Sequence, residues 1–144
     1  MRNILRTRES FAYILFLAVA VISLLHLLSV WFGWYYIYTW IDNPLHVMGG
    51  AFVALLFLNL FLVRKPQITF HHPLALFVLG LSFVAFIGIV WELYEFFSDI
   101  FILHAYPPFS APPDLHFDTL KDLVNDLLGG ATTLLLYLWR AKKS

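Results

Sequence analysis

The sequence contains no cysteine and few charged residues, and both shortages narrow what the protein can be. Without cysteine there are no disulfide bonds and no thiolate ligands for zinc or an iron–sulfur cluster. Charged residues make up 12% of the 144 residues, whereas 61% are hydrophobic. A typical soluble domain carries about 25% charged residues. The composition therefore argues against a soluble enzyme and predicts a protein embedded in a membrane.

Several catalytic and nucleic-acid signatures are also missing. The sequence has no His-Glu-x-x-His, Gly-x-Ser-x-Gly or P-loop pattern. It has no Glu-x-x-His pair, which argues against a ferritin-type di-iron centre. The basic residues form short clusters that membrane topology alone explains, so nucleic-acid binding is not expected.

Four apolar segments are long enough to cross a bilayer, which takes about 20 residues. They are residues 11–32, 44–63, 74–99 and 118–139. Because they leave no room for a soluble domain, we expect residues 1–144 to form one all-α domain, a bundle of four transmembrane helices. For the first segment the alternative is a signal peptide cleaved after Ala20, but the apolar run continues past that residue.

The basic residues predict the orientation of this bundle. Eight of the nine lysines and arginines fall into three clusters. These are Arg2, Arg6 and Arg8; Arg64 and Lys65; and Arg140, Lys142 and Lys143. With four spans the three clusters share one side of the membrane, and cytoplasmic loops carry the excess of basic residues. We therefore expect both termini in the cytoplasm and a multi-pass protein of the inner membrane.

The second and fourth segments resemble each other. Residues 42–51 match residues 122–131 at an offset of 80: an aspartate opens both stretches and a Gly-Gly-Ala triplet closes both. This predicts two repeated helical hairpins about a pseudo-twofold axis along the membrane normal. Chance similarity between apolar helices is the alternative. The glycine pairs should also let the two helices approach closely, just beneath the polar residues.

Local signals predict where three of the helices begin. Asp42-Asn43 should cap the second helix and Asp118-Thr119 the fourth, while Pro73 should open the third. The four prolines between His104 and Phe117 predict an irregular outer loop.

Acidic and histidine side chains enter the outer halves of all four segments at helical spacings. A charge deep in a membrane costs about 2.5–3.5 kcal/mol, so these groups should face the bundle interior. The candidates are His26, Asp42, His46, Glu92, Glu95, Asp118, Asp122 and Asp126. Gathered carboxylates repel, so protonation, water or a metal cation must balance them. Carboxylates with one or two imidazoles suit Mg²⁺, Mn²⁺, Zn²⁺ or Fe²⁺.

These candidates divide by role. The expected metal ligands are His46, Glu92, Asp122 and Asp126, with Asp42, Asp118 and His26 as further candidates. The expected catalytic residues are Glu95, as a general base, and Glu92. Plainer interpretations exist as well. Asp42 and Asp118 could be helix caps, and His26 could simply hydrogen-bond a neighbouring serine.

Three stretches resemble a known group of proteins. They are Asp42 to His46 at the start of a helix, Trp91-Glu92-Leu93-Tyr94-Glu95, and Asp118 to Gly130. Together they resemble VanZ-like and YjdF-like small bacterial inner-membrane proteins, and the YjdF-like type fits better. The resemblance implies a polytopic membrane protein, with one branch tied to glycopeptide-antibiotic resistance.

Three functions fit these features. The favoured one is a metal-dependent hydrolase or transferase acting on a lipid or lipid-linked small molecule. The others are a proton- or cation-coupled transporter or channel subunit, and a non-catalytic accessory subunit of a membrane complex. The sequence leaves open whether the protein is an enzyme and whether it forms a homo-oligomer.

Overall fold

The computed structural model describes residues 8–38, 40–64, 70, 72–102 and 115–143. The helices are α1 (Arg8–Trp31), α2 (Trp34–Ile37), α3 (Asp42–Leu58), α4 (Pro73–Phe101) and α5 (Leu115–Lys142). A π-helical turn, η1 (Asn59–Val63), continues α3. The expected all-α architecture with four long helices is confirmed. Arg2, Arg6, Lys65, His104 and most of the proline-rich outer loop lie outside the described residues.

Three of the long helices have the length and composition of membrane spans: Glu9–Trp31, Asp42–Val63 and Pro73–Phe101. With 28 residues α5 is long enough, but its first half carries charged side chains. These are Asp118, Lys121, Asp122 and Asp126. A chain segment with this composition is too polar to qualify by hydropathy alone, so membrane insertion of α5 stays a prediction.

The helix starts were predicted with mixed success. Pro73 does open α4, and the His72 side chain caps it by accepting a hydrogen bond from the Leu74 backbone N–H, 3.2 Å away. The capping role predicted for Asp42 is wrong, because α3 has Ile41 at its N-cap position and no side-chain cap. Its carboxylate is therefore available for other contacts. α5 begins at Leu115, three residues before the expected Asp118 cap.

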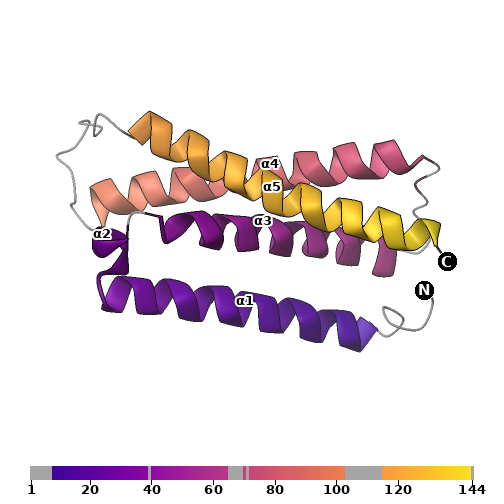
Figure 1. The fold of residues 1–144 in the computed structure, drawn as a ribbon, viewed down its shortest axis with the longest axis horizontal. Helices are drawn as coiled ribbons and strands as arrows, with labels where there is room; N and C mark the ends of the chain where they lie inside the picture. Colours follow the sequence, from indigo (N-terminus) through magenta and orange to yellow (C-terminus); the bar gives the residue numbers. More distant parts are fainter. Residues whose placement is uncertain (1–7, 39, 65–69, 71, 103–114, 144) are drawn as a thin grey trace.

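The long helices run up and down, so α1 begins and α5 ends at the same end of the bundle (Figure 1). The C-terminal ends of α1 and α4 and the N-terminal ends of α3 and α5 meet at the opposite end. α3 is central, because it packs against α1, α4 and α5. Among the described residues α1 packs on α2, α3 and η1, with no comparable packing on α4 or α5.

The half of the bundle that contains the chain ends has an apolar core. The Phe57 ring lies 5.0 Å from Phe61, 6.1 Å from Phe70 and 5.8 Å from Phe83, measured between centroids. Outward-facing apolar side chains remain exposed on every long helix, as expected for a surface that faces hydrocarbon. The described polar side chains of this half include the buried Asn59, whose Oδ1 accepts a hydrogen bond from Arg64 Nε.

Glycines bring α3 and α5 together, as the sequence predicted. A Cβ at Gly50 would collide with the backbone carbonyl of Asp126, and one at Gly129 would collide with that of Val47. Helices in lipid associate through such close packing. Nothing in the structure gives evidence that the two hairpins are repeats, so the predicted pseudo-twofold axis is left without support.

We predict opposite effects for two neighbouring substitutions on α3. Gly50→Ala should destabilise the protein by about 1–3 kcal/mol, because the added methyl overpacks the α3–α5 contact. Gly49→Ala should be neutral or slightly stabilising, since its Cβ would make an ordinary 3.6 Å contact and alanine favours helix. Thermal unfolding of both variants in one detergent compares them. Equal midpoints would contradict the close approach.

Candidate functional site

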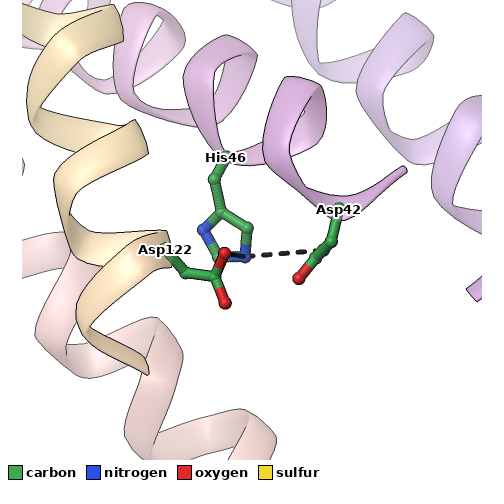
Figure 2. Close-up of side chains that lie close together, drawn as sticks. All are labelled: Asp42, His46 and Asp122. Atoms are coloured by element: carbon green, nitrogen blue, oxygen red, sulfur yellow. Dashed lines mark ion pairs between the residues drawn. The ribbon is translucent and has the colours of Figure 1, made fainter. Parts of the chain in front are cut away.

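His46 lies at the centre of the polar end of the bundle. It is one turn after Asp42 on α3, so both side chains share a helix face. The imidazole is buried, with 5% of its side chain exposed. Its Nε2 atom lies 3.6 Å from Asp42 Oδ1 and 4.0 Å from Asp122 Oδ1. Figure 2 shows these carboxylates, from α3 and α5, close to the same edge of the ring.

The Asp126 carboxylate faces the other nitrogen of the His46 ring. Its Oδ1 atom lies 3.4 Å from His46 Nδ1, and the residue is buried between α3 and α4. Gly88 on α4 makes room for it, because a Cβ there would come within 2.8 Å of Asp126 Oδ2. Asn125 supports the contact by donating from Nδ2 to Asn43 Oδ1, 3.3 Å away on α3.

This placement distinguishes the two ring nitrogens of His46. A neutral imidazole carries its proton on one nitrogen and a lone pair on the other. If Nδ1–H donates toward Asp126, Nε2 presents its lone pair to the space between Asp42 and Asp122. Metal-binding histidines are commonly held this way, with the second nitrogen fixed by a carboxylate.

The Nε2 distances suit metal ligands better than hydrogen bonds. Hydrogen bonds between nitrogen and oxygen are about 2.7–3.2 Å long, shorter than 3.6 and 4.0 Å. Two atoms that each bind one ion at about 2.0–2.2 Å lie up to about 4.4 Å apart. Ligand atoms of Asp42, His46 and Asp122 all lie within 4.8 Å of one another. A closing of the widest pair by a few tenths of an ångström, within the reach of side-chain rotation, would let these three residues converge on a single cation.

A second group surrounds the same histidine. Ligand atoms of His46, Glu92 and Glu95 also lie within 4.8 Å of one another. Two carboxylate oxygens of the cluster, Glu92 Oε1 and Asp122 Oδ1, are buried and have no hydrogen-bond partner. Asp122 is 3% exposed. Buried oxygens without a hydrogen bond need an explanation, and an ion is one of the standard ones.

Not every predicted site residue joins these groups. Asp118 is largely exposed and pairs with Lys121, whose Nζ lies 2.6 Å from Asp118 Oδ1. The same Nζ lies 3.6 Å from Asp122 Oδ1. Lys121 therefore brings a positive charge to the rim of the cluster, and Asp118 lies outside both three-residue groups.

His26 also lies outside both groups, because Tyr35 holds it. Its Nδ1 atom lies 2.7 Å from the Tyr35 hydroxyl oxygen, rather than bonding a neighbouring serine. Burial, and then the nearby Asp42 and Glu95 carboxylates, raise the pKa of Tyr35 from 10.0 to about 12. Sequence analysis did not identify Tyr35 as a site residue, because it sits on the short α2, where no helical spacing links it to the other candidates.

A cavity of about 460 Å³ adjoins the cluster. Its polar lining residues come from α1, α2, α3, α4 and α5. They are Ser23, His26, Tyr35, Asp42, His46, Glu95 and Asp126. The remaining lining is apolar or glycine, so the cavity joins a polar site to an apolar space. All four long helices thus contribute polar side chains to the wall of this cavity.

The chain belongs to the family described as "Predicted membrane protein (DUF2238)", whose family model matches residues 4–143. This finding corrects the resemblance to VanZ-like and YjdF-like proteins, since the family that matches is DUF2238. No curated protein and no solved structure matches the chain. Family membership establishes a membrane protein, and the chemistry has to be argued from the site.

We predict that Tyr35 ionises near pH 12. The folded pKa is raised, so the hydrogen-bonded neutral tyrosine contributes stability below pH 10 that is lost as the pH rises through about 12. The tyrosinate absorbance of the wild type minus that of Tyr35→Phe isolates this group. A midpoint near 10 in that difference would contradict the buried contact with His26.

Proposed function

We propose that this DUF2238 protein is a divalent-metal hydrolase or transferase that acts on a lipid or lipid-linked substrate at the headgroup level of the inner membrane. The observation that carries the proposal is the arrangement around His46. One ring nitrogen faces Asp126, and the other faces Asp42 and the buried Asp122 Oδ1, which has no hydrogen-bond partner. This is a donor set that divalent cations prefer.

The residues of the cluster take different parts in this proposal. His46 Nε2, Asp42 and Asp122 hold the ion, and Asp126 orients the imidazole through Nδ1. Glu92 is a further ligand from the second group. A bound divalent ion would supply Lewis-acid activation of water or of a substrate oxygen. His26 and Asp118, expected as ligands from the sequence, are assigned no metal contact.

Glu95 is the proposed general base. Its side chain lines the cavity and lies within the second group around His46, so it can reach both the ion and a substrate in the cavity. In hydrolysis of an ester-linked lipid, the Glu95 carboxylate accepts a proton from water as the oxygen attacks the carbonyl carbon. The ester C–O bond then breaks, and the alcohol leaves with that proton. The products are an acid and an alcohol.

The structure favours catalysis over transport, because the polar path stops halfway. Carboxylates and histidines gather at one end, whereas the other half is filled by the Phe57 core cluster. A transporter needs access to both faces. An accessory subunit that binds basic groups of a partner would need exposed acids, but Asp122 and Asp126 are buried. The basic Arg64 and Arg140 lie at the apolar-core end, which we place at the cytoplasm.

We predict that purified wild-type protein retains a divalent metal and that Asp122→Asn abolishes this binding. Changes to residues that only orient a ligand weaken affinity by about 10–100-fold, so loss of a ligand should cost more. Asp118→Asn is the matched control, because it lies one turn away on α5, is exposed and is outside the ligand groups. Metal is measured by mass spectrometry after anaerobic purification and reloading with Mg²⁺, Mn²⁺, Zn²⁺ or Fe²⁺.

Two further variants test catalysis against transport. Glu95→Gln should keep the metal and lose turnover of membrane lipids by at least about 100-fold, as expected when a general base is removed. If the wild type binds none of the four metals and so does not differ from Asp122→Asn, the metal-site proposal is wrong. Proton or cation flux in liposomes that disappears in Asp126→Asn would instead favour a transporter.

A further inference from the structure

The cavity beside His46 changes in character along its length. His26 and Val19 on α1 both line the cavity and are seven residues apart. His46 and Val53 on α3 line it at the same spacing. At 1.5 Å per residue this is a depth of about 10 Å. The cavity therefore runs from the polar site toward the middle of the bundle with an increasingly apolar wall.

The cavity also reaches the outer surface of the bundle. Val19 and Leu27 on α1 and Trp91 on α4 line it, yet they are 41%, 63% and 44% exposed. α1 packs on α3 without comparable packing on α4. The opening therefore lies between α1 and α4, on a side of the molecule that faces hydrocarbon when these helices span a membrane.

We propose that this cavity binds one acyl chain of a membrane lipid, which enters sideways between α1 and α4 and places its polar linkage beside His46 and Glu95. This inference rests on the proposed function, because it names the substrate class of that site. The apolar part of the wall offers water few hydrogen-bond partners. The volume of 460 Å³ falls in the usual range for small-molecule pockets, about 300–1,000 Å³.

The negative charge of the site restricts which headgroup the bound lipid can have. The described cluster contains five carboxylates, from Asp42, Glu92, Glu95, Asp122 and Asp126. In the described ion pairs of this cluster, the basic residues are His46 and Lys121. Lys121 already contacts two aspartates. One divalent ion would leave this site without excess positive charge to hold a phosphate. The lipid headgroup at the site should therefore be uncharged, as in an acylglycerol.

A photoreactive monoacylglycerol with a diazirine in its acyl chain tests this inference on the full-length protein in detergent. Peptide mapping should place the label on α1, α3 and α4 at the cavity wall. Val19→Trp fills the cavity mouth and should reduce labelling at these positions at least about 10-fold. Val21→Trp is the matched control, because Val21 is exposed on the same helix and does not line the cavity. Metal content is measured on the same samples.

Each outcome bears on one of the two proposals. Cavity labelling that falls in Val19→Trp but not in Val21→Trp supports acyl-chain binding. Normal metal content with labelling spread evenly over the exposed helix faces, and equal in both variants, would overturn it while leaving the metal site intact. Cavity labelling in metal-free protein would support chain binding and count against the proposed catalysis. Preferential labelling by the matching lysophosphatidic acid probe would contradict the uncharged headgroup.

Discussion

Electrostatic repulsion among carboxylates buried around one histidine is the constraint on which the polar end of this protein depends. Asp42, Asp122 and Asp126 surround the His46 ring, and they come from two helices that the fold holds in contact. Charges removed from water need close partners of opposite sign. A divalent cation at Nε2, as proposed, would supply more positive charge than a protonated imidazole and would also contact Asp122 Oδ1, which has no hydrogen-bond partner. Under the proposed function, metal binding and the fold of this end are therefore linked.

The glycines explain how such a site can be built between helices. Gly50 and Gly129 bring the α3 and α5 backbones into contact, and Gly88 lets the Asp126 carboxylate lie against α4. A side chain at Gly50 or Gly129 would push α3 and α5 apart, and one at Gly88 would displace the Asp126 carboxylate. Close packing, which stabilises helices in lipid, thus also sets the distances between the imidazole and its carboxylates. Phe11 on α1 joins the apolar core of the opposite half, and the later turns of α1 border the cavity.

The sequence predicted much of the fold and the membership of the cluster, because both follow from hydropathy and helical spacing. It indicated the long helices, the close glycine contact and the gathering of acidic and histidine side chains at one end of the bundle. It could not indicate that Asp42 does not cap α3 or that His26 hydrogen-bonds the Tyr35 hydroxyl. It also could not indicate which carboxylate faces which ring nitrogen of His46. Spacing assigns a residue to a face of its helix, whereas these details depend on helix rotation and on the short α2.

The most direct test of the account is whether His46 binds a metal through its ring nitrogen. Purified protein loaded with Mn²⁺ can be studied by electron spin-echo envelope modulation, which detects nitrogen bound to the ion. We predict modulation from one imidazole nitrogen in the wild type and its loss in His46→Asn, with the remaining ligands being oxygen. A wild-type spectrum without nitrogen modulation, equal to that of Mn²⁺ in water, would contradict the central claim.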